Sequence, residues 1–205
     1  MAEELALFEQ GFRLIAGLDE VGRGSLAGDV VAAAVILPPD PGVLARLRGV
    51  RDSKQLTPRQ RTYLCATIQA EAIAIGLGRV PASEIDRIGI LPATRRAMGL
   101  AIAGLNVNPE FLLIDAVRLF DVSIPQKPII RGDVTCLSIA AASVIAKVDR
   151  DRTMSDLDHV YPGYGFAHNK GYGTAFHCQQ LQLLRPCPIH RRSFAPVRAA
   201  QEASV

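Results

Sequence analysis

The chain has 205 residues, of which 49% are hydrophobic and 21% charged, as in a single globular domain. The apolar content excludes a disordered chain, and the 17 glycines and 13 prolines have no collagen-like period. No run approaches roughly 18 uncharged apolar residues, so we expect no membrane-spanning helix. The first ten residues include three acidic side chains and no basic one, unlike a signal peptide, and we expect a cytoplasmic protein.

The formal net charge is +3, and the last third of the chain is locally basic and contains all four histidines. Such a region suits a polyanionic ligand, although a solvated surface explains it equally well. The four cysteines lie at positions 65, 136, 178 and 187, without zinc-finger spacing. We therefore expect reduced thiols, mostly buried as small hydrophobic side chains.

The N-terminal half predicts three strands and one helix. Arg13–Leu18 is a short apolar strand, and Val30–Leu37 is a continuous apolar run that ends at two prolines. The latter pattern is typical of a strand buried on both faces. Thr57 is followed by a proline, which together predict the start of a helix. Ala72–Val80 predicts a third strand.

The C-terminal half predicts alternating helices and strands. Pro92–Leu105 is expected to be a helix with Leu100 on its buried face, beside Ala97. The next predicted elements are two strands, Phe111–Val117 and the short Pro128–Ile130. They are followed by a helix over Leu137–Val148, a loop over Tyr161–Gly173 and a helix over Thr174–Leu184. This order predicts an α/β fold with a mixed sheet flanked by helices. We expect one domain over residues 1–205, with residues from about 156 forming a small helical cap.

Four acidic residues lie close to predicted strands. Asp19 and Glu20 end the first strand, Asp115 lies within an apolar run, and Asp133 immediately precedes a helix. A buried carboxylate is costly unless it is paired or bound to a metal. Taken singly, each acid has a structural explanation, because strand ends accept acids and Asp133 suits a helix N-cap.

Together, these acids favour a metal site. Four carboxylates at one place repel one another, and divalent cations relieve that repulsion. Ligands that are all oxygen atoms favour Mg²⁺ or Mn²⁺ over zinc. Two such ions, about 3.5–4 Å apart, promote in-line hydrolysis of a phosphodiester by water.

A glycine-rich turn follows the first acidic pair. Gly22, Arg23 and Gly24 form an ordinary tight turn on their own, but beside a metal site their main chain is suited to contact a sugar–phosphate backbone. Lys54 and Arg191 lie in short polar segments that suit phosphate contacts, although each segment alone is nonspecific.

Several motifs occur in a fixed order along nearly the whole chain. They are Ala16–Gly24, Asp52-Ser53-Lys54, the segment around Asp115, Gly132-Asp133 with Ser138–Lys147, Lys170–Thr174 and His190–Phe194. This series resembles the type 2 ribonuclease H (ribonuclease HII) family. The resemblance implies a ribonuclease H-like fold in which four acids bind two Mg²⁺ or Mn²⁺ ions, namely Asp19, Glu20, Asp115 and Asp133.

The same resemblance implies the reaction and its substrate. The enzyme would cleave the RNA strand of RNA–DNA hybrids and cut 5′ to a single ribonucleotide in duplex DNA, leaving 3′-hydroxyl and 5′-phosphate ends. The main chain of Gly22, Arg23 and Gly24 would contact the ribose 2′-hydroxyl, the group that distinguishes RNA from DNA. Tyr172 would stack on the next deoxyribose. We expect a monomer acting in ribonucleotide removal from DNA.

The sequence departs from the family pattern at three places. Arg131 replaces an expected lysine, and Val134-Thr135-Cys136 replaces the usual small and basic residues after Asp133. The chain also ends soon after Val197, so we expect modest duplex affinity.

Three alternatives remain open. The first is another ribonuclease H-like metal-dependent nuclease, such as a junction resolvase or integrase, and a substrate panel with and without one ribonucleotide separates them. The second is a nucleic-acid-binding module without catalysis, which a magnesium-dependent cleavage assay tests. The third is a glycosidase with two carboxylates, whose chemistry needs no metal.

Overall fold

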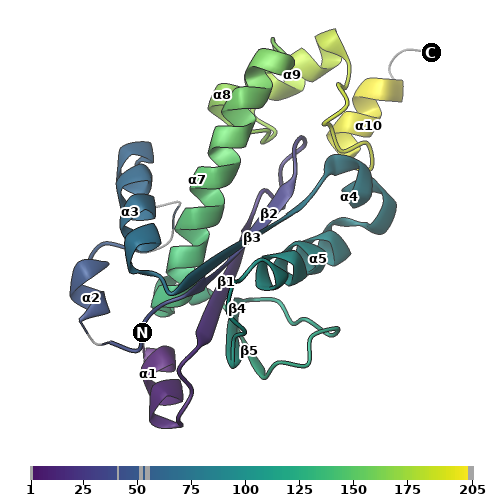
Figure 1. Cartoon of the computed structure of the whole chain (residues 1–205). Helices are drawn as coiled ribbons and strands as arrows, with labels where there is room; N and C mark the ends of the chain where they lie inside the picture. Colours follow the sequence, from purple (N-terminus) through teal and green to yellow (C-terminus); the bar gives the residue numbers. More distant parts are fainter. Residues whose placement is uncertain (1, 41, 51–52, 54–55, 203–205) are drawn as a thin grey trace.

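The computed structural model describes residues 2–40, 42–50, 53 and 56–202, and it forms a mixed five-stranded sheet with helices on both faces (Figure 1). The sheet order is β3-β2-β1-β4-β5. The strands are β1 Ile15–Val21, β2 Val30–Ile36, β3 Ala74–Val80, β4 Phe111–Asp115 and β5 Gln126–Ile129. The helices are α1 Ala2–Glu9, α2 Val43–Arg46, α3 Pro58–Glu71, α4 Ala82–Ile88, α5 Ile90–Ala103, α6 Gly132–Thr135, α7 Leu137–Val160, α8 Phe166–Asn169, α9 Ala175–Leu184 and α10 Ala195–Glu202.

Both strand directions occur in the sheet, which confirms the predicted mixed α/β class. β2 pairs antiparallel with β1 and β3, whereas β4 pairs parallel with β1 and β5. The three N-terminal strands are connected in sequence, and the chain reaches β4 and β5 after α4 and α5. β2 and β3 are antiparallel although α2 and α3 lie between them in the chain, and β4 and β5 are parallel although no described helix lies between them.

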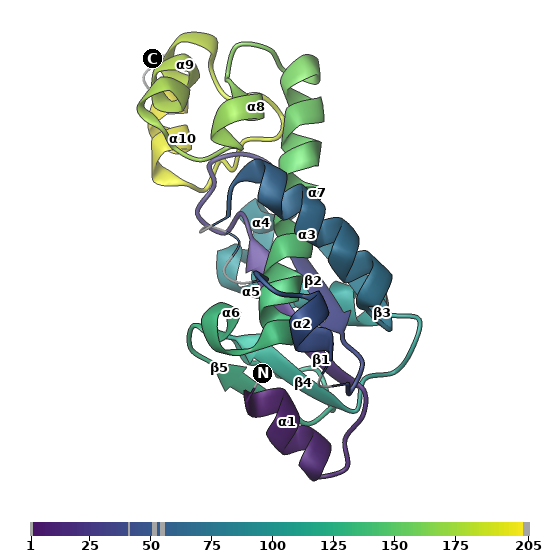
Figure 2. The same ribbon diagram turned by 90° about the vertical axis from the view of Figure 1, so that its left-hand side faces the viewer.

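The central strand β2 is buried along its whole length, as its continuous apolar pattern predicts. Ala32 and Ala34 pack in the cluster that contains residues of α5. Val31 and Ala33 pack in the cluster that contains residues of α3 and α7. Successive side chains of a strand point to opposite faces, so one apolar strand joins the two layers of helices (Figures 1 and 2).

Helix α7 lies directly against β1, and two features fix its start. A Cβ atom at Gly17 would overlap the main chain of Ser138, so glycine allows the close approach. Glu4 of α1 accepts hydrogen bonds from the main-chain nitrogen and the hydroxyl of Ser138, both at 2.9 Å. A carboxylate at the first turn of a helix satisfies an otherwise unpaired N–H group and opposes the helix dipole favourably.

Several predicted boundaries differ from the structure. β1 continues to Val21, so Asp19 and Glu20 lie inside the strand and not after it. β4 ends at Asp115 because Ala116 adopts a left-handed conformation with φ 51°. Leu100 was predicted on the buried face of α5, which is wrong: it is 44% exposed, while Ala97 is buried.

The chain after Val160 folds around the far end of α7 (Figure 2). Phe166, Leu181 and Val197 share a buried cluster with Met154 of α7 and with Leu26, which follows β1. Thus this segment packs on both the long helix and the turn between β1 and β2. Three of the four cysteines are buried, as predicted, and all four are free thiols. No described helix is long and apolar enough to cross a membrane.

Candidate active site

Two neighbouring parallel strands bring the first acids together. In the pairing of β1 with β4, Leu18 lies beside Ile114. The residues that follow, Asp19 and Asp115, therefore reach the same edge of the sheet, and Glu20 is one position further along β1. Carboxyl ends of parallel strands meet at one edge, where functional residues commonly gather in open α/β sheets.

Asp19 is the most deeply placed of these acids, at 7% exposure. Burial raises the pKa of its carboxyl well above the usual range, and the charges of Glu20 and Asp115 raise it further. A hydrogen bond with Ser143 and another from the main-chain nitrogen of Glu20, at 2.7 Å, act in the opposite direction. The charged carboxylate therefore lacks full compensation from the protein.

Glu20 is held from one side only. Its Oε1 accepts a hydrogen bond from Arg23 Nη1 at 3.2 Å. Within the described residues, its Oε2 is buried and has no hydrogen-bond partner. Burial raises the pKa of Glu20 in spite of the opposing effect of Arg23, and the charge of Asp115 adds to the rise. A buried carboxylate oxygen without a donor is suited to a cation.

Asp115 and Asp133 are connected through the start of α6. Asp115 Oδ1 accepts a hydrogen bond from the main-chain nitrogen of Gly132 at 2.7 Å, and Asp133 is the next residue along the chain. Asp133 lies in the first turn of the short helix α6 and is not the N-cap of the long helix, because α7 begins only at Leu137.

The donor set fits hard divalent cations. It consists of carboxylate oxygens, two of the carboxyls have raised pKa values, and one buried oxygen has no donor. In the described part of the chain, no three acidic, histidine or cysteine side chains already converge on a single metal position. The acids are thus close enough to raise one another's pKa values, but their side chains do not surround one metal position.

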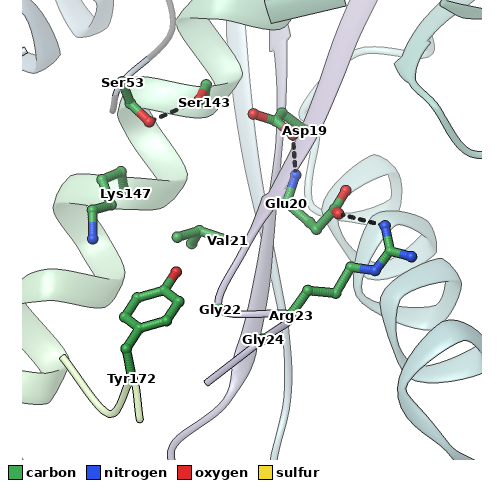
Figure 3. Close-up of a pocket in the computed structure, with 10 residues that line it drawn as sticks. All are labelled: Asp19, Glu20, Val21, Gly22, Arg23, Gly24, Ser53, Ser143, Lys147 and Tyr172. Atoms are coloured by element: carbon green, nitrogen blue, oxygen red, sulfur yellow. Dashed lines mark hydrogen bonds and ion pairs between the residues drawn. The ribbon is translucent and has the colours of Figure 1, made fainter. Parts of the chain in front are cut away.

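A cavity of about 400 Å³ joins two of the acids to the glycine-rich turn and to Tyr172 (Figure 3). Its lining comprises Asp19, Glu20, Val21, Gly22, Arg23, Gly24, Ser53, Ser143, Lys147 and Tyr172. The Tyr172 ring projects towards the cavity from the loop after α8, opposite the acids (Figure 3). Four segments far apart in sequence therefore meet at one opening.

Ser143 and Lys147 are site residues that analysis of individual motifs did not single out. Ser143 Oγ lies 2.9 Å from Ser53 Oγ, and Ser143 also bonds Asp19. Lys147 lies four residues later on the same face of α7 and donates to Asp151 at 2.7 Å. The available signal was polar residues at helical spacing in the otherwise apolar first half of α7.

Two buried arginines hold the main chain of the glycine-rich turn. Arg191 Nη1 donates to the carbonyl of Arg23 at 3.0 Å, and its Nε and Nη2 donate to the carbonyl of Gly28. Arg150 donates to the carbonyls of Asp29, Ala27 and Lys170 at 2.8–3.0 Å. Arg150 therefore ties the segment after the turn to the loop that carries Tyr172.

A sequence model of the family described as Ribonuclease HII matches residues 16–197. The chain belongs to the ribonuclease HII family. A Ribonuclease HII of Dehalococcoides mccartyi is 53% identical over 203 residues, which cover 97% of this chain and 93% of that protein. The ribonuclease H2 of Pyrococcus horikoshii OT3 matches with a TM-score of 0.79 and 27% identity, covering 92% of this chain and 97% of that one.

The fold is also shared with a more distant protein. Bst-RNase HIII, solved in complex with Mn²⁺, matches with a TM-score of 0.74 at 21% identity, covering 98% of this chain and 73% of that one. Membership of the ribonuclease HII family makes the chain a metal-dependent endoribonuclease that hydrolyses RNA in RNA–DNA hybrids. This activity excludes two of the alternatives, the glycosidase and the non-catalytic binding module.

Two predicted phosphate contacts of this ribonuclease HII have different outcomes. The prediction that Arg191 contacts phosphate directly is wrong, because its side chain is fully buried and bonded to main-chain carbonyls. Lys54 lies outside the described residues, whereas the neighbouring Ser53 is buried against α7. Arg131, which replaces the expected lysine, is exposed and has a left-handed φ of 58°.

Proposed function

We propose that this family member cuts duplex DNA on the 5′ side of a single ribonucleotide, as well as long RNA–DNA hybrids, and so acts in the cytoplasm to remove ribonucleotides from DNA. The observation that carries this proposal is the shared cavity: Asp19 and Glu20 lie on one side and Tyr172 on the other, with the main chain of Gly22–Gly24 between them. Cleavage groups and sugar-reading groups therefore act on the same backbone.

Asp19, Glu20, Asp115 and Asp133 would hold two divalent ions, Mg²⁺ or Mn²⁺. Such ions would supply activation of water and stabilisation of the charge on the scissile phosphate, for a cut that leaves 3′-hydroxyl and 5′-phosphate ends. The chain's own residues hold the carboxylates in position. Ser143 orients Asp19, Arg23 orients Glu20, and the main-chain nitrogen of Gly132 orients Asp115. The Mn²⁺ complex of Bst-RNase HIII, which has the same fold, supports testing that ion beside Mg²⁺.

Recognition of the ribose would come from the main chain of the turn. Gly22 has φ +87° and lies against the Arg150 side chain, a position that a larger residue cannot occupy without moving it. Arg191 donates a hydrogen bond to the carbonyl of Arg23 and so fixes the conformation of the turn, whose main-chain N–H and C=O groups then have defined positions. The 2′-hydroxyl both donates and accepts, and it matches main-chain groups of this kind.

Tyr172 would define the junction by packing its ring against the next deoxyribose, where a 2′-hydroxyl would crowd it. The ring centroid lies 5.7 Å from Lys147 Nζ and 5.6 Å from Arg150 Cζ, so two cations flank the ring. Cations beside an aromatic ring stabilise its position. They also add positive charge where a phosphate backbone would pass.

The experiment is cleavage of a duplex with one ribonucleotide, with product ends mapped, beside a uniform hybrid and an all-DNA duplex. We expect a single cut 5′ to the ribonucleotide and no cut in DNA. Tyr172→Ala should lose most cleavage at the junction, up to about 10²-fold because the scissile bond is misplaced, whereas Tyr172→Phe should retain much of it. Junction cleavage by folded Tyr172→Ala at the wild-type rate and position contradicts the proposal.

We also propose that the chain works as a single monomeric domain in which residues from about 156 form a helical cap. In support of one domain, the cavity is lined by residues that extend along the chain from β1 to the loop after α8. The cap shares a buried cluster with Leu26 and Met154. Sedimentation at assay concentration tests the monomer, and a single cooperative melting transition tests the one-domain architecture.

A further inference from the structure

A buried pair of histidines lies behind the loop that carries Tyr172. His177 of α9 and His190 are 0% and 1% exposed, and their Nε2 atoms are 3.1 Å apart. His177 Nδ1 lies 2.9 Å from the main-chain carbonyl of Tyr172. Neither histidine has a part in the proposed cleavage chemistry.

The hydrogen bonds assign the ring protons in one consistent direction. The main-chain nitrogen of Cys187 donates to His190 Nδ1 at 3.0 Å, with the thiol of Cys187 at 3.1 Å from the same atom. His190 Nδ1 is therefore the acceptor, and its Nε2 carries the proton. That proton is donated to His177 Nε2, which leaves the proton of His177 on Nδ1, facing the carbonyl of Tyr172.

The surroundings keep both rings neutral and fixed. Burial lowers the pKa of His177, and burial together with the charge of His177 lowers the pKa of His190 to about 4. The rings of Tyr164 and Phe166 pack against both histidines, with centroids 4.9–6.4 Å apart. A proton on both nitrogens of His177 would place two donors against each other between the Nε2 atoms, and a proton on both nitrogens of His190 would place a donor against the main-chain nitrogen of Cys187.

Helix geometry aims this chain of hydrogen bonds at Tyr172. Thr174 caps α9 by accepting from the main-chain nitrogen of His177 at 3.2 Å, so His177 lies in the first turn. Helical side chains lean towards the N-terminus, which directs His177 back to the preceding loop. The carbonyl of Tyr172 also accepts from the main-chain nitrogen of Thr174 at 2.8 Å. Both bonds fix the peptide that follows Tyr172.

We propose that His190 and His177 are positioning residues for junction recognition: the ordered series from Cys187 through both rings to the Tyr172 carbonyl holds the Tyr172 ring against the deoxyribose. This inference rests on the proposed role of Tyr172. It assigns a specificity function to two residues that touch no substrate. The rings act through one carbonyl, and so their effect must pass through Tyr172.

The test compares two substitutions that each remove one hydrogen bond of His177. The side-chain amide of asparagine occupies the place of Nδ1, so His177→Asn keeps the donor to Tyr172 and loses the bond to His190. The amide of glutamine reaches the place of Nε2, so His177→Gln keeps the contact with His190 and loses the donor to Tyr172. The melting temperatures of both variants measure the loss of stability that each suffers when the buried ring of His177 is replaced.

The readout is kcat/KM on a duplex with one ribonucleotide divided by kcat/KM on a uniform RNA–DNA hybrid. We expect His177→Gln to lower this ratio about tenfold, as for loss of one hydrogen bond to a buried carbonyl, and His177→Asn to keep it near the wild-type value. In a Tyr172→Ala background, both substitutions should leave the ratio unchanged. Equal ratios for His177→Gln and His177→Asn in the presence of Tyr172 overturn the inference.

A second measurement separates this inference from the proposed function. Amide hydrogen exchange of Thr174 reports the peptide bonded to the Tyr172 carbonyl, and it should be faster in His177→Gln than in His177→Asn. The same exchange rate in both variants overturns the positioning role, whatever Tyr172 does. Faster exchange in His177→Gln, together with a wild-type ratio for Tyr172→Ala, overturns the reader role of Tyr172 and the specificity function with it.

Discussion

Buried charges of opposite sign are treated differently in this site. Arg150 and Arg191 are almost inaccessible, and their guanidinium groups donate to main-chain carbonyls. Asp19 and Glu20 are also largely removed from water, yet burial raises the pKa of each and Glu20 Oε2 has no donor among the described residues. The two arginines in this site are thus hydrogen-bonded by the protein, whereas the two carboxylates lack full compensation and suit a bound cation.

The role of Asp19 gives a first prediction. Asp19→Asn should abolish cleavage in Mg²⁺ and in Mn²⁺, because a ligand charge is lost while the side-chain volume is kept. Burial and neighbouring acids disfavour the charged form of Asp19, so the variant should melt in chelator at or above the wild-type temperature. Asp121→Asn, at an exposed position, is the matched control and should cleave normally. Substantial turnover by Asp19→Asn refutes the metal role.

Two adjacent arginines give a second prediction. Arg191→Ala removes three charged hydrogen bonds to buried carbonyls and should lower the free energy of unfolding by about 3 kcal/mol or more. Arg192, which is exposed, should tolerate alanine with little change in stability. Urea denaturation measures both.

Binding measurements distinguish this role of Arg191 from a phosphate contact. A direct contact contributes about 0.9 to the slope of log affinity against log salt, whereas a buried support should leave the slope of the folded variant unchanged. A slope reduced by about one unit in Arg191→Ala, at wild-type stability, contradicts the supporting role.

Among the elements, α7 determines the relation between cleavage and recognition. Its N-terminal half packs beneath β1 and brings Ser143 to Asp19. Further along, Arg150 reaches the turn after β1 and the loop that carries Tyr172. A single continuous helix runs from the sheet to the C-terminal segment (Figure 2). It therefore sets the distance between the acids and the tyrosine.

The close approach of α7 to β1 gives a third prediction. Gly17→Ala places a Cβ against the main chain of Ser138, which cannot rotate away, and should destabilise the protein by about 3 kcal/mol or more. Gly99→Ala, within α5 and facing open space, should stabilise it by about 1 kcal/mol through helix propensity. Thermal unfolding of the two variants is the measurement. Equal effects of the two substitutions argue against tight packing at β1.

At the scale of the molecule, the sheet and its two helical layers are built from apolar side chains, and the acids lie at one edge. The two large core clusters lie on the two faces of the sheet, whereas Asp19, Glu20 and Asp115 lie at the carboxyl ends of β1 and β4. Folding and metal binding should therefore be separable properties.

This separation gives a fourth prediction. Removing divalent ions with a chelator should abolish cleavage of the hybrid while the protein stays folded, with only the modest fall in melting temperature that loss of a bound ligand causes, and adding Mg²⁺ or Mn²⁺ should restore activity. Adding Zn²⁺ should restore less, because the predicted ligands are all oxygen atoms. A collapse of the fold on chelation would assign the ions a structural role, and full activity in chelator would remove them from the reaction.

The sequence by itself determined the elements whose patterns are local and strong. The apolar run of β2, the helix that starts after Thr57, and the helix predicted over Thr174–Leu184 all appear in the structure within one residue of the predicted places. Motif order also determined the family, which the comparisons confirm. For the strand and the two helices, neighbouring residues carry the whole signal, and for the family the order of short motifs carries it, so neither depends on a contact between distant segments.

Tertiary structure decided what depends on contacts between distant segments. Arg191 is a basic residue in a basic segment, which suits a phosphate contact, but only the packing of this segment against Gly28 shows that its side chain is buried. Leu100 fits a helical stripe, yet the sheet covers only part of that face. The relation of His177 to Tyr172 likewise arises because α9 folds back on its preceding loop beside His190. Burial and hydrogen-bond direction are properties of the assembled chain, and residue type alone does not specify them.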